Sequence, residues 1–406
     1  HVIEGAIAML GFQLVSGAEV LPVLITEELG YSRVTFGWVH SIIQASFLLP
    51  LLLSPLLETG GRRKRLVMTL GIGQRLPMAL IALGLVFFAH TEETYGLVVI
   101  IIAGAMLLRA ISGRLNGGPW NDLIAETIPE RRHSQLWGFR SMFSSGMRLL
   151  AAPLCLLILD WLVFPGNYIT LYMLAFCLAM VSWLVFGLVD DVPEHVPEQP
   201  RRPFVTYYRD LARDFVRDSS FRYYLAFRIL AGLGTAVFVF CAVEAVKVHG
   251  MNKAYVIFVL MLGRNAARMG GSWLAPQFAE RIGYKRLIFF ASTVMVFAAL
   301  VAGFAPVGWG GLFLAGALTA SFGGSARAVG FQSYRLRLLP RGKRVGYQAM
   351  LGAAVAVTAI VAMPLVGHVM ENFGHTFGFY MGAVITGASC LPLLRCHVRD
   401  RAAAEA

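Results

Sequence analysis

Long apolar runs separated by short polar connections dominate this chain. Hydropathy divides it into twelve runs, each close to the ~20 residues that an α-helix needs to cross a ~30 Å hydrocarbon core. The runs lie near 2–25, 34–57, 66–89, 95–118, 135–159, 168–189, 222–246, 254–278, 284–304, 309–334, 345–370 and 376–396. The ~10-residue segments of alternating polarity that are typical of transmembrane β-strands do not occur. The pattern therefore predicts an all-α membrane protein with twelve transmembrane helices.

One connection is longer than the others and divides the runs into six and six. It opens with the proline-rich stretch "DDVPEHVPEQPRRP" and then becomes amphipathic, which predicts a helix on the membrane surface. Its apolar face would carry Phe204, Tyr207, Tyr208, Leu211 and Phe215. The sequence predicts an N-terminal six-helix bundle at 1–190 and a C-terminal six-helix bundle at 222–396. A cytoplasmic linker that contains the amphipathic helix joins them at 191–221, and a cytoplasmic tail follows at 397–406.

Composition and charge placement agree with this class and orient the chain. Hydrophobic residues make up 57% of the 406 residues and charged residues 14%, whereas soluble domains carry about a quarter. Most Lys and Arg lie in connections after even-numbered runs, and connections after odd-numbered runs hold only Arg33, Lys247 and Lys253. Because Lys and Arg mark the cytoplasmic side, we expect both termini in the cytoplasm and the chain in the inner membrane. This distribution excludes a basic groove for nucleic acid, despite the net charge of +12.

Several chemistries lack their sequence signatures. The five cysteines have no metal-binding or redox spacing, which predicts free thiols and neither a metal site nor a cofactor. The chain has no Gly-x-x-x-x-Gly-Lys-[Ser/Thr] loop and no connection large enough for an ATPase domain. No nucleophile and base stand out either, so we do not expect an enzyme. If the chain transports a solute, an ion or solute gradient must drive it.

The two halves repeat a short pattern after their second run. The first copy reads "ETGGRRKR" and the second reads "ERIGYKR". Both place an acid three residues before a glycine, followed by cations. The shared positions are Glu58 and Gly61 in the first copy and Glu280 and Gly283 in the second. The first copy adds Arg62 directly after its glycine, and the second adds Arg281 directly after its acid. Duplicated halves around a central connection are typical of secondary transporters.

These residues resemble the major facilitator superfamily, whose loop between spans two and three follows roughly G-x-x-x-D-R-x-G-R-[RK]. Glu58 takes the Asp position, Gly61 and Arg62 match, and Thr59 replaces the first Arg. The resemblance implies two pseudo-symmetric six-helix bundles that work by alternating access. It also implies that both copies of the pattern form cytoplasmic gates. The alternative for the four cations 62–65 is that they only set topology.

Charged residues inside the predicted spans are the first candidates for function. The spans contain nine arginines but only three acids, Glu4, Glu19 and Glu244. Each such charge costs ~2.5–3.5 kcal/mol to insert, so deep ones should face a cavity or a partner. Arg75 is expected to find its partner within the N-terminal half. Four others lie close enough to the cytoplasmic face to extend into water: Arg114, Arg140, Arg228 and Arg327.

Polar stripes on two spans suggest where substrate would bind. The resemblance implies that the fifth and eighth spans face each other across the boundary between the halves, which brings Arg148 and Arg264 towards a central cavity. The predicted substrate-binding residues are Arg148, Arg264, Arg268, Asn265, Ser144, Gln44 and Gln13. Arginine grips carboxylates and phosphates well, so we expect an anionic or zwitterionic organic substrate. Small polar residues in these stripes have an alternative role as helix-packing contacts.

Glu19 is the leading candidate for proton coupling, with Arg109 as the second coupling residue. A buried carboxylate can bind and release a proton as access alternates. The alternative is that Glu19 is a fixed partner of Arg75 or Arg109. We therefore expect the protein to carry out proton-coupled or exchange transport as a monomer. Its expected partners are a small-molecule substrate, protons and the lipid bilayer.

Two other functions stay open. The apolar, aromatic spans would suit a carrier or flippase for an amphiphile such as a lysolipid or a drug-like molecule. The altered gate pattern would also suit a transporter-like membrane assembly factor. The Gly-Pro signature that drug exporters of the superfamily carry in span five is missing, which argues against multidrug export.

Overall fold

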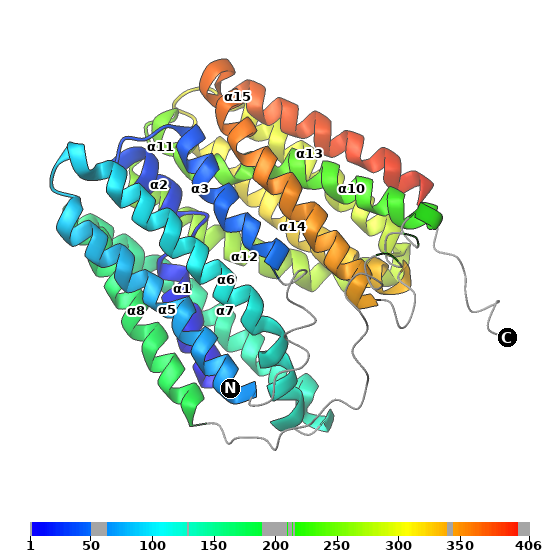
Figure 1. The fold of residues 1–406 in the computed structure, drawn as a ribbon. Helices are drawn as coiled ribbons and strands as arrows, with labels where there is room; N and C mark the ends of the chain where they lie inside the picture. Colours follow the sequence, from blue (N-terminus) through cyan, green and yellow to red (C-terminus); the bar gives the residue numbers. More distant parts are fainter. Residues whose placement is uncertain are drawn as a thin grey trace. The chain divides into compact units, whose positions relative to one another are not determined.

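The structure is a computed structural model that describes residues 2–49, 63–127, 130–188, 209, 213, 216–338 and 344–396. Every regular element in these ranges is a helix, which confirms the all-α prediction (Figure 1). Three predicted gate residues, Glu58, Gly61 and Arg62, lie outside the described residues. So does nearly all of the amphipathic helix predicted within 191–221.

The chain divides into two compact units. The first contains His1–Gln199 and Ala242–Asn265, and the second contains Pro200–Cys241 and Ala266–Ala406. The segment Ala242–Asn265 therefore groups with the N-terminal helices, although it lies far along the chain. Its ion pairs, described below, explain this grouping.

The first unit consists mainly of long helices. They are α1 (Val2–Leu14), α2 (Val20–Val23), α3 (Arg33–Ala45), α5 (Arg63–Phe88), α6 (Tyr95–Thr127), α7 (Glu130–Trp161), α8 (Gly166–Gly187) and α11 (Cys241–Lys247), with short turns at Leu24–Glu28, Ser46–Leu48 and Glu92–Thr94. The first span is interrupted between α1 and α2. Pro22 explains the interruption, because it lacks an N–H and its ring clashes with the preceding turn of a continuous helix.

The second unit consists of the remaining helices. They are α10 (Ser219–Thr235), the short helix Ala236–Phe240, the later part of α12 (Lys253–Ile282), α13 (Tyr284–Phe304), α14 (Gly310–Leu338) and α15 (Arg344–Arg395). The 52-residue α15 contains two predicted spans, because Gly374 has non-helical angles (φ 84°, ψ 164°) that separate them. Glycine reaches this positive φ without a steric cost. With α15 counted as two passes, the helices follow the twelve predicted spans.

Seven helical segments of the described residues are long and apolar enough to cross a membrane. One of them, Met350–Arg395, covers the two passes of α15. The spans that fall short are those of α1, α3, α7 and α12. All seven residues predicted above to bind substrate lie on these four helices.

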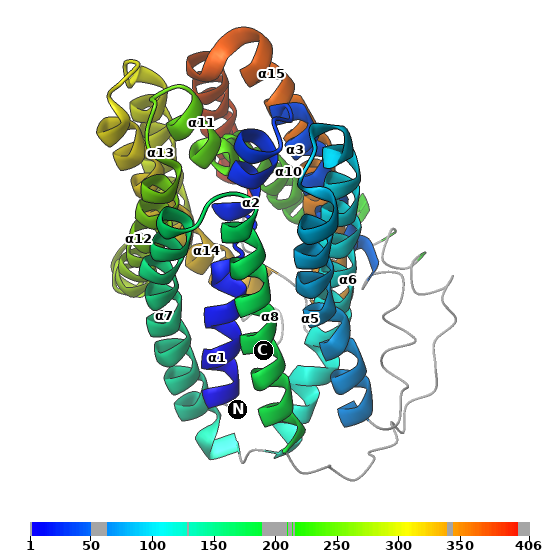
Figure 2. The ribbon, with the colours of Figure 1, turned by 90° about the vertical axis from the view of Figure 1, so that its left-hand side faces the viewer.

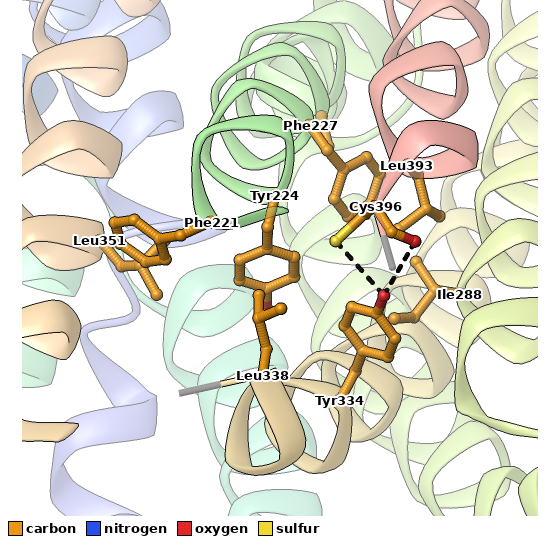
Figure 3. Packing of buried hydrophobic residues seen from close by; sticks show 10 residues of the cluster. Phe221, Tyr224, Phe227, Ile288, Tyr334, Leu338, Leu351, Leu393 and Cys396 are labelled. Carbon is orange, nitrogen blue, oxygen red and sulfur yellow. Dashed lines mark hydrogen bonds between the residues drawn. The ribbon is translucent and has the colours of Figure 1, made fainter. Parts of the chain in front are cut away.

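The core of the second unit is aromatic at one end (Figure 3). Tyr224 and Phe227 of α10 pack near Tyr334 of α14, with Tyr224 and Tyr334 rings 5.9 Å apart. Tyr334 donates a hydrogen bond to the carbonyl oxygen of Cys396, at 3.3 Å. Lys285 Nζ also donates to this carbonyl, at 2.8 Å. These donors satisfy carbonyl groups that the end of α15 would otherwise leave without partners.

Close contact between α10 and α15 depends on two facing glycines, Gly234 and Gly382. A Cβ on Gly234 would lie 2.6 Å from the backbone nitrogen of Thr386 and 2.9 Å from the carbonyl oxygen of Gly382. We expect Gly234→Ala to destabilise the protein by about 1–3 kcal/mol or more, because backbone atoms cannot move aside as a side chain can. Thermal unfolding of the purified protein measures this. Gly352→Ala in α15 is the control, since a Cβ there meets no atom within 4 Å, and should be neutral or stabilising. Equal melting temperatures for the two variants would contradict the prediction.

Candidate functional site

A buried ion pair joins the interrupted first span to α12. Glu19 lies where α2 begins, and its Oε1 atom is 3.0 Å from Nη1 of Arg264. The side chains are 3% and 5% exposed, respectively. Ser16 also donates a hydrogen bond to Glu19. The interruption after α1 thus places a carboxylate and a hydroxyl together inside the first unit.

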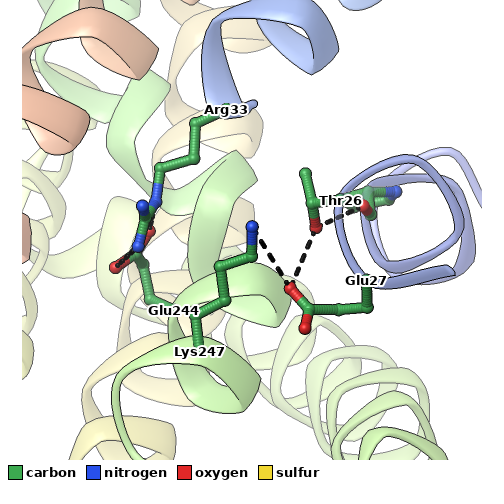
Figure 4. A network of polar contacts seen from close by, with 6 residues as sticks. Thr26, Glu27, Arg33, Glu244 and Lys247 are labelled. Carbon is green, nitrogen blue, oxygen red and sulfur yellow. Dashed lines mark hydrogen bonds and ion pairs between the residues drawn. The ribbon is translucent and has the colours of Figure 1, made fainter. Parts of the chain in front are cut away.

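Three further ion pairs join the chain that follows α2 to α11 and α12. Figure 4 shows two of them, the pair of Arg33 with Glu244 and the pair of Lys247 with Glu27. Arg33 binds Glu244 through two hydrogen bonds of 2.5 and 3.1 Å, and Glu244 is fully buried. Lys253 Nζ is 2.5 Å from Glu28, and Lys247 Nζ is 3.7 Å from Glu27. We call these six residues the ion-pair cluster. It binds the segment Ala242–Asn265 to the N-terminal helices and so accounts for its place in the first unit.

A π-helical turn at Leu24–Glu28 positions the acids of this cluster. The turn presents Glu27 and Glu28 in succession towards α11 and α12. Thr26 donates to the carbonyl oxygen of Pro22 at 2.9 Å, and its hydroxyl lies 3.3 Å from Glu27 Oε1. The hydroxyl therefore stiffens the turn next to the Glu27 carboxylate, as Figure 4 shows.

Sequence reasoning did not select the ion-pair cluster, although a signal was present. Arg33, Lys247 and Lys253 are the only cations in the connections after odd-numbered runs, where the topology rule disfavours them. The structure gives each one a carboxylate partner. Cations on the side where the topology rule disfavours them therefore indicated that acidic partners lie nearby.

Two other arginines of the first unit approach α1 without a carboxylate. Arg148 of α7 places Nη2 3.0 Å from the sulfur of Met9, and the Arg109 guanidinium of α6 lies 4.8 Å from the centre of the Phe12 ring. Both arginines are only partly buried. In the described part of the chain, neither forms an ion pair. Two positive charges therefore flank the same face of α1.

The other residues predicted to bind substrate have various surroundings. Asn265 is buried and donates to the Met261 carbonyl of its own helix, at 2.8 Å. Gln44 bonds to the ring of His40 at 2.8 Å, and Gln13 is half-buried in α1. Arg268 is exposed one turn after Arg264, and Ser144 lies in α7. Arg264 itself binds Glu19 through Nη1.

The second copy of the gate pattern lies in the second unit. Glu280 and Arg281 are exposed at the end of α12. Gly283 follows with a φ of 82° and precedes α13. The glycine thus makes the sharp turn that the sequence pattern requires.

The expectation that Arg327 extends into water was wrong. Arg327 of α14 is 7% exposed, and its Nη1 atom has no hydrogen-bond partner among the described residues. Its guanidinium lies 5.4 Å from the centre of the Phe331 ring, and that of Arg228 lies 4.2 Å from the same ring. Two arginines therefore share one aromatic ring inside the second unit, a cation–π arrangement that depth along the helix did not predict.

Comparison with solved structures gives the fold. The chain is similar to a bacterial homologue of the iron transporter ferroportin in an inward-facing state (TM-score 0.76, 12% identity, 97% of each chain covered). It is also similar to the nucleoside transporter NupG (TM-score 0.74, 14% identity, 97% of this chain and 98% of that one). A D-xylose–proton symporter matches with a TM-score of 0.71 at 14% identity, over 97% of this chain and 95% of that one. No curated protein sequence matches significantly.

A sequence-family comparison gives the affiliation. The model of the Major Facilitator Superfamily matches residues 5–278, which is more than half of the chain. The helices, the glycine turn at Gly283 and the solved structures agree with this match. The chain is an integral membrane protein that belongs to the major facilitator superfamily.

Proposed function

We propose that this protein is a secondary active transporter that moves an anionic or zwitterionic organic molecule together with protons, by alternating access. The observation that carries the proposal is the buried pair of Glu19 and Arg264. The solved structures of similar fold support the general class, because their names describe transporters and include a proton symporter.

The pair of Glu19 and Arg264 supports coupling between proton binding and substrate binding, because Glu19 and an anionic substrate would compete for Arg264. While Glu19 is charged, it neutralises Arg264. A proton on Glu19 would remove the carboxylate charge opposite the guanidinium, and removing one partner of a buried ion pair costs about 3–5 kcal/mol. An incoming carboxylate or phosphate would recover that energy by binding Arg264. Proton binding and anion binding would therefore favour each other, and such coupling is reciprocal.

Further arginines support an anionic substrate. Arg109 and Arg148 flank α1, where aromatic and thioether groups contact them in place of carboxylates. Arg327 in the second unit has a buried nitrogen that lacks a partner among the described residues. An anion entering the protein would meet these charges as attractive sites.

The ion-pair cluster supports a gate in the same transport cycle. Its three pairs hold α11 and the start of α12 against the turn at Leu24–Glu28 and α3. In this proposal the pairs separate when the substrate site opens to the side that the odd-numbered connections face. The distribution of Lys and Arg favours the outer side for these connections, with both termini in the cytoplasm.

Proton flux in proteoliposomes tests the substrate class. Vesicles containing the purified protein and a trapped pH dye would be offered carboxylates, phosphate esters, amino acids, neutral sugars and organic cations in turn. We expect an anion or zwitterion to move protons, and Arg148→Gln to reduce the initial rate at least tenfold. Arg286→Gln is the matched control, since Arg286 is exposed at the start of α13. Proton movement with sugars or cations alone would contradict the proposal.

A further inference from the structure

A separate cavity lies inside the first unit, between α1, α5, α6 and α8. These helices neighbour one another, and Figure 2 shows α1, α8 and α5 on the near side of the molecule. The cavity has a volume of about 370 Å³, within the usual range for small-molecule sites. Its walls include four aromatic side chains, those of Phe12, Trp120, Trp183 and Phe186. Neither Glu19 nor Arg264 lines it.

Three side chains that line this cavity donate their hydrogen bonds to the protein itself. Arg75 donates Nε to the Ala179 carbonyl at 2.7 Å and Nη1 to the Gly71 carbonyl at 2.8 Å. Trp183 Nε1 donates to the Met68 carbonyl at 3.0 Å. Gln74 donates to the Ser112 carbonyl at 3.4 Å. These contacts also bear out the expectation that Arg75 finds its partners within the N-terminal helices.

One hydrogen-bond acceptor at the cavity remains unsatisfied. Asn116 of α6 is only 9% exposed, and its Oδ1 atom has no hydrogen-bond partner in the described part of the chain. A buried acceptor without a partner costs about as much as a lost hydrogen bond, so such groups are normally satisfied. The donors of Arg75, Trp183 and Gln74 described above are bound to backbone carbonyls, so Asn116 Oδ1 is available as an acceptor for a molecule that enters the cavity.

The charges at the cavity balance. Glu4 is buried, accepts a hydrogen bond from Ser182 at 3.3 Å, and belongs to the same network as Arg75, whose Nη2 lies 3.5 Å from the Ser182 hydroxyl. One carboxylate and one guanidinium leave no net charge for an ionic ligand to neutralise. An anion would also face the carboxylate of Glu4 and the amide oxygen of Asn116.

We infer that this cavity binds an uncharged aromatic amphiphile that donates one O–H or N–H hydrogen bond to Asn116 Oδ1 while its ring packs among Phe12, Trp120 and Trp183. The inference goes beyond the proposed transport of an anion, because it concerns a different site and a different class of ligand. Gly117 on the cavity wall leaves space for the ring. A Cβ on Gly117 would meet no atom within 4 Å.

A pair of matched probes tests the site. 4-Bromophenol and 4-bromoanisole have similar rings and a bromine that quenches nearby tryptophans, but only the phenol donates a hydrogen bond. Quenching would be titrated on the purified full chain. We expect saturable quenching by 4-bromophenol and about threefold to tenfold weaker binding of 4-bromoanisole, the range for one neutral hydrogen bond. A Trp120→Phe/Trp183→Phe double variant should remove the saturable part, which assigns it to this cavity.

Three variants distinguish binding of the probes at this cavity from non-specific partitioning of the probes into the protein. Asn116→Leu should make the two probes bind equally, and Gly117→Leu should weaken 4-bromophenol at least tenfold by filling the cavity. Gly104→Leu is the control, because Gly104 is on the same helix, has open space around it and does not line the cavity. Equal, non-saturating quenching of the wild-type protein by both probes would overturn the inference, even if no variant folded. So would a crystal soaked in 4-bromophenol that contains only water beside Asn116.

Discussion

Glu19→Gln is expected to abolish uptake driven by a pH gradient, with an initial rate at least a hundredfold below that of the wild type. Glutamine keeps the shape of the side chain but cannot carry a negative charge or exchange a proton. Arg264 would then remain buried, at 5% side-chain exposure, opposite a neutral amide. The variant should still exchange substrate for substrate across the membrane, because that reaction moves no net proton.

Two assays on the same proteoliposomes check this prediction. Uptake with and without an imposed pH gradient reports coupling, and counterflow of labelled substrate reports exchange. Glu92→Gln is the control, since Glu92 is an exposed acid in the short turn Glu92–Thr94. Undiminished gradient-driven uptake in Glu19→Gln would show that another group carries the proton.

Variants of Arg264, the partner of Glu19, distinguish its role in balancing the buried charge from its proposed role in binding substrate. Arg264→Met alone leaves Glu19 buried without a counter-charge, so we expect a loss of stability of about 3–5 kcal/mol. The double variant Glu19→Gln/Arg264→Met removes both charges and should recover most of that loss. It should not recover transport, because the arginine proposed to bind the anion is gone. Recovery of transport in the double variant would limit the pair to a structural role.

Glu244→Gln is expected to open the ion-pair cluster. Glu244 is fully buried and Arg33 is 15% exposed, so the pair is sheltered from solvent and salt. Removing the carboxylate should cost the closed arrangement about 3–5 kcal/mol, which corresponds to a rise on the order of a hundredfold or more in the open fraction. Lys253→Met removes a pair whose lysine is 38% exposed and should change that fraction only a few-fold.

Labelling of a native cysteine measures this opening. Cys241 is fully buried at the start of α11, one turn before Glu244. In a variant that keeps only this cysteine, a membrane-impermeant maleimide should react much faster after Glu244→Gln than after Lys253→Met. The charge swap Arg33→Glu/Glu244→Arg should restore slow labelling if attraction between these residues closes the cluster. Equal labelling rates for all variants would show that the pairs do not control access.

Much of the fold was predictable because hydropathy and chain length act locally. A run of about 20 apolar residues must form a helix in lipid, since no water is available to satisfy the backbone. The two spans inside α15 illustrate the point, because the connection predicted between them, 371–375, contains Gly374, whose backbone angles separate the two helices in the structure. The positive φ at Gly283 follows equally from its place in a short gate pattern.

The partners of the buried charges were not predictable in the same way. Position in the sequence suggested Arg75 or Arg109 as an alternative partner of Glu19, whereas the structure pairs it with Arg264, which lies 245 residues away. Depth along the helix suggested that Arg327 reaches water, although the structure buries it beside Phe331, one turn along the same helix. Hydropathy indicates that a charged residue in a membrane span needs a partner, but it does not indicate which side chain supplies that partner.

The sequence by itself determined that the chain crosses a membrane as helices, approximately where those helices lie, and that polar stripes mark the fifth and eighth spans. These properties depend on the free energy of placing each residue in lipid, which is set by that residue's own side chain. Only the tertiary structure decided that Glu19 holds Arg264, that three misplaced cations each hold an acid, and that Asn116 faces a cavity with an unsatisfied oxygen. Those facts depend on how helices rotate and pack against one another, and packing joins residues that the sequence keeps far apart.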